Sequence, residues 1–132
     1  MTTVLSRRSF LVLTCLWAAL IFYLSHQPGT LVPALFPMQD KVMHMVAYAI
    51  LGFLGMGSAR TTTHGYRPVQ AWRVCLLAGL YGVSDEIHQY FIPGRMSDVL
   101  DVMADFAGGM LGVWLMYFLV KRISRHRQPP AA

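Results

Sequence analysis

The sequence is poor in charged residues and in cysteine. Charged residues make up 13% of the 132 positions, about half of the share near 25% that is usual in soluble domains. Hydrophobic residues make up 55%, which is too many for a disordered chain. Both cysteines, Cys15 and Cys75, fall in apolar segments, and this indicates small buried side chains rather than a disulfide or a metal-binding pair. The length excludes a multidomain enzyme, and the composition predicts a membrane protein.

Four apolar segments are separated by polar or turn-forming stretches and predict four transmembrane helices. Each spanning helix needs about 20 mostly apolar residues, so four helices would use roughly 80 positions. The remainder is too short for a separate soluble domain. The predicted fold is all-α: a polytopic membrane protein that forms a single domain over residues 1–132. The expected helices cover residues 10–25, 41–58, 74–92 and 99–120, followed by a polar tail at 121–132.

The first apolar segment could be mistaken for an export signal. It follows Arg7 and Arg8, and the string SRRSFL at residues 6–11 resembles a twin-arginine signal. No A-x-A cleavage site follows the apolar run, and three further apolar segments come after it. We therefore expect an uncleaved first helix.

Lysine and arginine are distributed unevenly around the four segments. In a four-span topology nine of these residues fall on one side, and only Lys41 and Arg95 fall on the other. Because cytoplasmic loops carry an excess of Lys and Arg, both termini are predicted to be cytoplasmic, in the bacterial cytoplasmic (inner) membrane. The net charge of +5 reflects this bias, and nucleic acid is not an expected partner. The nine residues are Arg7, Arg8, Arg60, Arg67, Arg73, Lys121, Arg122, Arg125 and Arg127.

All the acidic residues fall on the outer side of this topology, where His44, Gln89 and Arg95 join them. Charged groups inside a membrane are costly unless they face the bundle interior or water. Three segments contribute them at similar depth, which predicts a functional site at the outer face. In the structural alternative these residues only hydrogen-bond helices together, a role that Asp85 in particular could fill. The six acidic residues are Asp40, Asp85, Glu86, Asp98, Asp101 and Asp105.

Small residues continue the carboxylate stripes of the third and fourth segments. Such stripes let helix backbones approach closely, so these two segments are expected to pack along them, with the carboxylates at the outer mouth. Asp40 and His44, one helical turn apart on the second segment, would close a third wall. The small residues are Ala78, Gly82, Gly108 and Gly112.

Several of these side chains are of metal-ligand types, yet no metal and no cofactor is predicted. Glu86 and His88 are two residues apart and point to different faces of a helix. The sequence has neither an HExxH motif nor a pair of cysteines at ligand spacing.

Arg95 follows Pro93 and Gly94 in a predicted tight turn above the acidic cluster. Two roles are open for it. The guanidinium could clamp a phosphate or carboxylate headgroup, or it could form an ion pair with Asp98 or Asp101 that fixes the loop.

The sequence resembles the VanZ-like family in three stretches: DKVMH at residues 40–44, YGVSDEIHQYFIPGR at 81–95, and DVLDVMAD at 98–105 followed by GGMLG at 108–112. The order, spacing and residue types all agree with the family pattern. Many members have Asn where this chain has Asp105, which argues against an essential negative charge there. The positions that match the motif are Asp40, Lys41, His44, Glu86, Gln89, Pro93, Gly94, Arg95, Asp101 and Asp105.

The resemblance implies a small bacterial membrane protein of several helices, in a family whose namesake is linked to low-level resistance to teicoplanin, an acylated glycopeptide. The leading hypothesis is an outward-facing polar site that binds an amphiphilic envelope lipid or an acylated glycopeptide and contributes to envelope integrity or teicoplanin-type resistance. Lys41 and Arg95 would hold an anionic headgroup. The ligand-binding candidates are Asp40, Lys41, His44, Glu86, Gln89, Arg95, Asp101 and Asp105.

Two alternatives come from other functional classes. The first is an intramembrane enzyme acting on a lipid-linked envelope precursor, with Glu86, His44 and Asp101 as the candidate catalytic residues. The second is a small proton-coupled transporter, although the charged residues stop in the outer half of the bundle. The expected partners are the lipid bilayer and the amphiphilic ligand, and a homo-oligomer is left as an open alternative.

Overall fold

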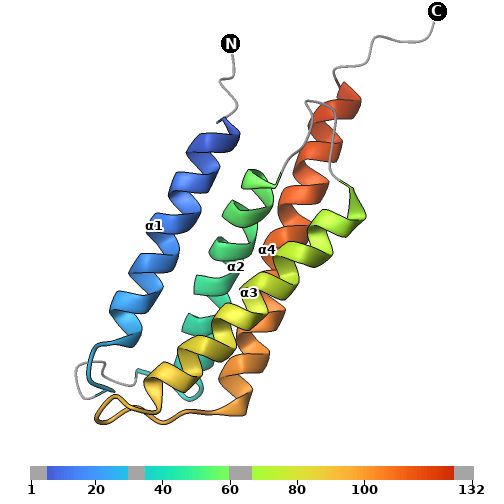
Figure 1. Ribbon diagram of the computed structural model, residues 1–132. Coiled ribbons are helices and arrows are strands. Elements are labelled where there is room, and N and C mark those ends of the chain that lie inside the picture. The colour runs from blue at the N-terminus through green and yellow to red at the C-terminus, as the bar shows by residue number, and fades with distance from the viewer. Residues whose placement is uncertain (1–5, 30–34, 60–66, 127–132) are drawn as a thin grey trace, which may run out of the picture.

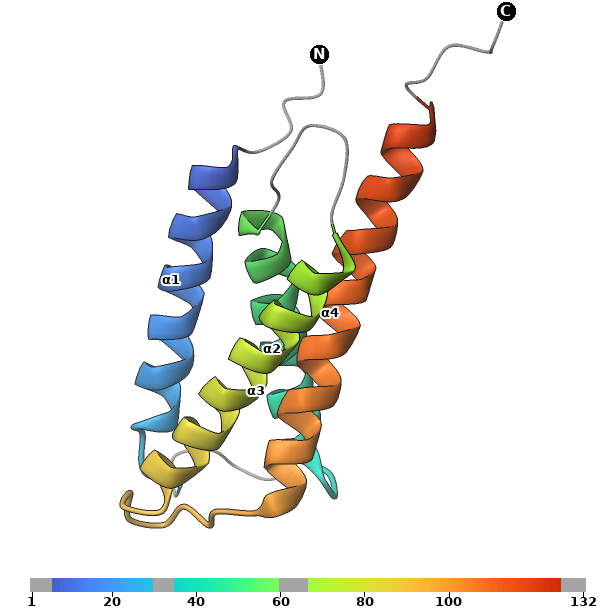
Figure 2. The same cartoon turned by 45° about the vertical axis from the view of Figure 1, so that its right-hand side comes forward.

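The computed structural model describes residues 6–29, 35–59 and 67–126, and its four elements in these ranges are all α-helices (Figure 1). The start of the first helix and the end of the last lie at the same end of the bundle in both views (Figures 1 and 2). The all-α prediction is confirmed for the described residues. The helices are α1 (Arg7–Ser25), α2 (Gln39–Ser58), α3 (Pro68–Gln89) and α4 (Val99–His126).

Three of these helices are long and apolar enough to cross a membrane: α1, α2 and Val99–Ile123 of α4. The 22 residues of α3 include Arg73, Asp85 and Glu86, and these charges lower its hydropathy. The outward face of α3 is nevertheless apolar, since Leu76 and Leu77 are 54% and 65% exposed. The helices therefore have the lengths and the apolar exterior of a membrane protein.

Capping interactions move several helix starts from their predicted positions. α1 begins at Arg7 rather than at residue 10, because the Ser6 side chain accepts a hydrogen bond from the Ser9 amide. α2 begins at residue 39 rather than 41. α3 begins at Pro68 rather than at residue 74. Proline suits the first helical position, and the Gln70 side chain accepts a hydrogen bond from the Arg67 amide just before the helix.

The ends of the last two helices also differ from the prediction. α3 ends at Gln89 rather than at residue 92, ahead of the turn that contains Pro93. α4 continues to His126, so the predicted end of the last helix at residue 120 is wrong, and residues 121–126 of the polar tail are helical. Basic residues are favourable in the last turns of a helix, which is why this polar stretch can stay helical. Residues 127–132 of the predicted tail, and Arg60 and Arg127 of the charge count, lie outside the described residues.

α2 and α4 make the most extensive contact between any two helices. A Cβ atom at Gly108 would meet the backbone of Met45, and one at Gly112 would meet the backbone of Ala49. The Gly108 and Gly112 stripe therefore faces α2, and the prediction that it packs against the third segment is wrong. The physical reason is that α2 presents small residues of its own, Ala49 and Gly52, so both backbones can approach.

α3 packs on another face of α4. A Cβ atom at Gly79 would meet the ring of Phe106, and one at Gly82 would meet the side chain of Asp105. Ala78 is buried and lies opposite Gly109. The part of the prediction in which the small residues of the third segment face the fourth is therefore confirmed.

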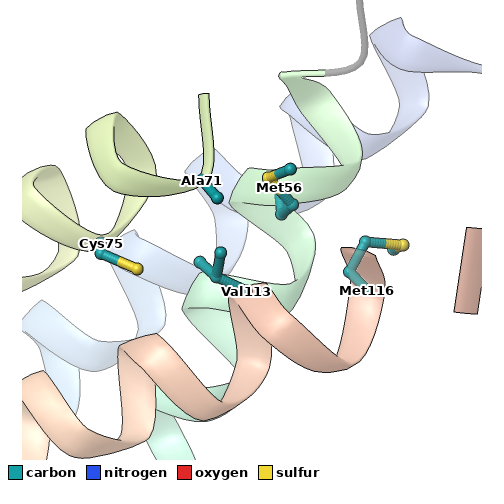
Figure 3. Close-up of a cluster of buried hydrophobic side chains, with 5 residues drawn as sticks. All are labelled: Met56, Ala71, Cys75, Val113 and Met116. Atoms are coloured by element: carbon teal, nitrogen blue, oxygen red, sulfur yellow. The ribbon is translucent and has the colours of Figure 1, made fainter. Parts of the chain in front are cut away.

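A cluster of buried apolar side chains fills the bundle beside the C-terminal half of α4 (Figure 3). Cys75 is buried in this core, as predicted. Cys15 is exposed, so the prediction is wrong there, because α1 buries only Ile21 and Ser25. Both cysteines are free. The buried members are Met56, Ala71, Cys75, Val113 and Met116.

The contact between α2 and α4 predicts a strong effect of added bulk. Gly112→Leu should lower the free energy of unfolding by roughly 2 kcal/mol, because overpacking forces the two backbones apart. This loss should exceed the gain of up to about 1 kcal/mol in helix propensity. Ala107→Leu is the control, since it adds a leucine to an exposed position of the same helix. Thermal unfolding in detergent compares the variants, and equal stability of the two would contradict the prediction.

Candidate functional site

All six acidic residues of the chain lie at the end of the bundle where α2 and α4 begin and α3 ends. We call this the acidic end. Four of the side chains, Asp85, Glu86, Asp101 and Asp105, are at most 5% exposed. Buried charges in an apolar bundle are costly unless they have partners, so the contacts of these carboxylates decide what the site can do.

Lys41, in the first turn of α2, holds three carboxylates together. Its Nζ atom lies 3.1 Å from Asp40 Oδ2, 2.8 Å from Asp98 Oδ2 and 3.2 Å from Asp101 Oδ1. The hydrogen bond from the ammonium lowers the pKa of the Asp98 carboxyl below its ordinary value. Asp98 also caps α4, because its Oδ1 accepts a hydrogen bond from the Leu100 amide. Lys41 thus joins the start of α2 to the start of α4.

His44, one turn further along α2, lies between a carboxylate of α3 and a carboxylate of α4. Its Nδ1 atom is 2.9 Å from Asp105 Oδ1 of α4, and its Nε2 atom is 3.9 Å from Glu86 Oε1 of α3. Asp105 rests against Gly82, where a Cβ atom would lie 2.6 Å from Oδ2. The other Glu86 oxygen, Oε2, accepts a hydrogen bond from the Asp98 amide at 3.0 Å. The structure therefore brings His44, Glu86 and Asp105 together.

Three buried side-chain oxygens around His44 have no hydrogen-bond partner among the described residues. They are Tyr48 Oη, Glu86 Oε1 and Asp105 Oδ2. A buried oxygen without a partner costs free energy, and in a native structure it calls for an explanation such as a bound ion or water. Sequence reasoning missed Tyr48, although it lies one turn beyond His44 and helical spacing could have identified it.

Asp85 joins α3 to α1. Its Oδ2 atom accepts hydrogen bonds from Ser25 Oγ at 2.8 Å and from Gln89 Nε2 at 3.2 Å. Ser25 is the last residue of α1 and was not identified from the sequence, because a lone serine at a helix end carries no functional signal. The cross-linking role considered for Asp85 matches this geometry, and Gln89, a ligand-binding candidate, belongs to the same hydrogen-bonded group.

Arg95 binds the end of α1 rather than an acidic residue. Its Nε donates to the Gln27 carbonyl at 3.1 Å, and its Nη2 donates to the Leu24 carbonyl at 2.9 Å. The ion pair with Asp98 or Asp101, one of the two roles left open for Arg95, is absent among the described residues. Carbonyls at a helix end lack intrahelical partners, and they take up the guanidinium instead. Because carbonyls are neutral, these two hydrogen bonds do not offset the positive charge of Arg95.

A cavity of about 720 Å³ lies between α1, α2 and the end of α3, within the range of 300–1,000 Å³ that is typical of ligand pockets. Five of the eight ligand-binding candidates line it, while Lys41, Glu86 and Asp105 do not. Its apolar lining includes Ile21, Leu24, Phe36, Met43 and Ala47. Its charged and polar lining includes Asp40, His44, Asp85, Gln89, Arg95 and Asp101.

Three potential metal ligands from three different helices converge at the acidic end. One ligand atom from each of His44, Glu86 and Asp101 lies within 4.8 Å of the others. His88 is not part of this group. Its Nε2 atom lies 3.2 Å from Nδ1 of His26 instead.

A protein-family model described as VanZ/LLP1 matches residues 10–121 of the chain. This range includes the acidic end, the cavity and parts of all four helices. No curated protein and no solved structure matches the chain.

The ion pairs of Lys41 predict a compensating double substitution. Lys41→Met should lower the free energy of unfolding by about 1–3 kcal/mol, because it leaves the buried Asp101 carboxylate without its cation. Adding Asp101→Asn removes the unpaired charge and should recover part of this loss. Thermal unfolding in detergent measures both, with Lys121→Met on the exposed part of α4 as the control. A double variant that is less stable than Lys41→Met alone would refute the prediction.

Proposed function

Because the chain belongs to the VanZ/LLP1 family, we propose that it is a four-span protein of the bacterial cytoplasmic membrane that binds an anionic amphiphile of the cell envelope. The ligand would be a lipid or an acylated glycopeptide, and it would occupy the cavity between α1, α2 and the end of α3. The observation that carries this proposal is the mixed lining of the cavity, which has an apolar wall and a charged and polar edge.

The exposed surface of α3 supports four spans. Its charged residues Asp85 and Glu86 are buried against the other helices, while Leu76, Leu77 and Leu80 are exposed. A helix with this distribution can face lipid with one side and the bundle with the other. Four spans put both termini on one side of the membrane, as the N-terminal end of α1 and the C-terminal end of α4 are at one end of the bundle (Figure 1).

The basic residues support an outward orientation of the acidic end. At that end the described cations are Lys41 and Arg95 alone, while the other end of the bundle is rich in arginine. Because basic residues accumulate on the cytoplasmic side, the cavity would open toward the outside. The basic residues at the other end include Arg7, Arg8, Arg67, Arg73, Lys121 and Arg122.

Arg95 is the proposed anchor for an anionic headgroup, in a cavity that Asp40, Asp85 and Asp101 also line. The charge of Lys41 is offset by three carboxylates, and Lys41 does not line the cavity. Arg95 lines the cavity, and among the described residues it donates only to the neutral carbonyls of Gln27 and Leu24. Guanidinium groups suit phosphate and carboxylate oxygens, and the acyl chain of the ligand would lie along Ile21 and Met43.

An acylated glycopeptide connects this site with resistance. The family's namesake is linked to teicoplanin, whose acyl chain makes it an amphiphile. A protein that binds such a molecule, or the lipids around it, at the outer face of the membrane would interfere with its action. The effect should be smaller for a glycopeptide without an acyl chain.

Amphiphile binding tests the role of Arg95 directly. Purified protein in lipid nanodiscs should bind an alkyl phosphate about tenfold more tightly than the alkyl phosphocholine of equal chain length, a difference of about 1.4 kcal/mol. Arg95→Gln should abolish this preference and Arg95→Lys should keep part of it, because only the lysine retains the charge. Arg73→Gln, at the other end of the bundle, is the control. A wild-type protein with equal affinity for both probes would disprove the proposed headgroup site.

Susceptibility assays test the role in resistance. In a glycopeptide-susceptible Gram-positive host, the wild-type protein should protect against teicoplanin more than against vancomycin. Arg95→Gln, expressed at a matched level, should lose this protection, and Arg73→Gln should keep it. If the wild type protects against neither drug, or against both equally, the teicoplanin-type role does not hold for this chain.

A further inference from the structure

We propose that His44, Glu86 and Asp101 bind a zinc ion at the acidic end of the bundle. One ligand atom from each residue lies within 4.8 Å of the other two. Ligand atoms around tetrahedral zinc lie about 3.4 Å apart, because each is about 2.1 Å from the metal. His44 Nε2 and Glu86 Oε1 are 3.9 Å apart, so small side-chain movements would complete the coordination.

The unpartnered oxygen of Glu86 is an independent indication of a cation. Glu86 is only 3% exposed, and its Oε1 atom has no hydrogen-bond partner in the part of the chain that the structure describes. The Asp98 amide fixes the other oxygen of this carboxylate at 3.0 Å. Oε1 faces His44 Nε2 at a distance beyond hydrogen-bond range. A metal ion between these two atoms would satisfy both.

Each of the three ligands also has the supporting partner that metal sites require. A metal-binding histidine usually donates its other ring N–H to a carboxylate, which fixes its tautomer, and His44 Nδ1 lies 2.9 Å from Asp105 Oδ1. The Asp101 carboxylate accepts a hydrogen bond from Lys41 at 3.2 Å. Together with the Asp98 amide on Glu86, these contacts would hold all three ligands in place.

The local charge favours a dication. Around His44 the buried carboxylates of Glu86, Asp101 and Asp105 face a single ammonium, that of Lys41. The group therefore carries two net negative charges when His44 is neutral. A protonated His44 would offset one of these charges, but it would leave Glu86 Oε1 without a hydrogen bond at 3.9 Å. A zinc ion balances both charges and contacts that oxygen.

The cavity gives the ion a route of entry. His44 and Asp101 both line it, so a zinc ion held by three protein ligands could keep its fourth position open toward the cavity, as catalytic zinc sites do. The inference goes beyond the proposed function and does not depend on an amphiphile. It is tested with the metal alone, so its failure would be separate from a failure of headgroup binding.

Zinc titration of the purified full chain in detergent tests the inference. After treatment with a chelator, the wild type should bind one Zn²⁺ per chain and unfold at a higher temperature with Zn²⁺ than without. Glu86→Gln and His44→Gln should bind at least about tenfold more weakly, because each loses a ligand. His88→Gln is the matched control for His44→Gln, since His88 is a histidine of α3 outside the ligand group.

X-ray absorption of the bound zinc supplies a measurement that does not depend on variants. One imidazole and otherwise oxygen ligands are expected, and sulfur ligands would show binding at a cysteine instead. The inference is overturned if the wild type shows no saturable Zn²⁺ binding, or if sulfur is found. It is also overturned if folded Glu86→Gln and His44→Gln bind as tightly as His88→Gln does.

Discussion

Carboxylates buried in an apolar bundle need polar partners, and the first two turns of α2 supply them for two carboxylates of α4. Lys41 and His44 lie one turn apart, and each bonds a different carboxylate of α4. Without these contacts Asp101 and Asp105 would be unpaired inside a protein whose exterior faces lipid, where an isolated charge is most costly. The ion pair of Lys41 and the hydrogen bond of His44 therefore fix both the depth and the rotation of α2 against α4.

The glycines of α4 make these contacts possible, because they let the backbones of the parallel helices α2 and α4 approach closely. Between the two polar contacts, and again between the two close backbone contacts, a step of about one turn along α2 corresponds to a step of about one turn along α4. A larger side chain at Gly108 or Gly112 would separate the two helices and lengthen the contacts that Lys41 and His44 make with α4. The pairs in order are Lys41 with Asp101, His44 with Asp105, Met45 with Gly108, and Ala49 with Gly112.

The sequence was sufficient to predict the helices and the gathering of the acidic residues, because hydropathy and helical periodicity are local properties. It could not identify the neighbour of each face. The Gly108 stripe was assigned to the third segment rather than to α2, since periodicity defines a face without its partner. For Arg95 the sequence left an anion clamp and an ion pair with nearby acids open, and it gave no sign that the turn folds back onto the end of α1. The group of His44, Glu86 and Asp101 has no local motif because its members come from three helices.

The two halves of the bundle differ in a way that bears on the choice among functions. All the acidic residues lie at one end, while Met56, Val113 and Met116 fill the interior toward the other. A proton relay needs a chain of ionisable groups across the membrane, and this apolar core interrupts it. Among the described residues, the polar site borders the cavity beside α1, at the acidic end of the bundle. Such a geometry suits binding or chemistry at one membrane face better than transport through the bundle.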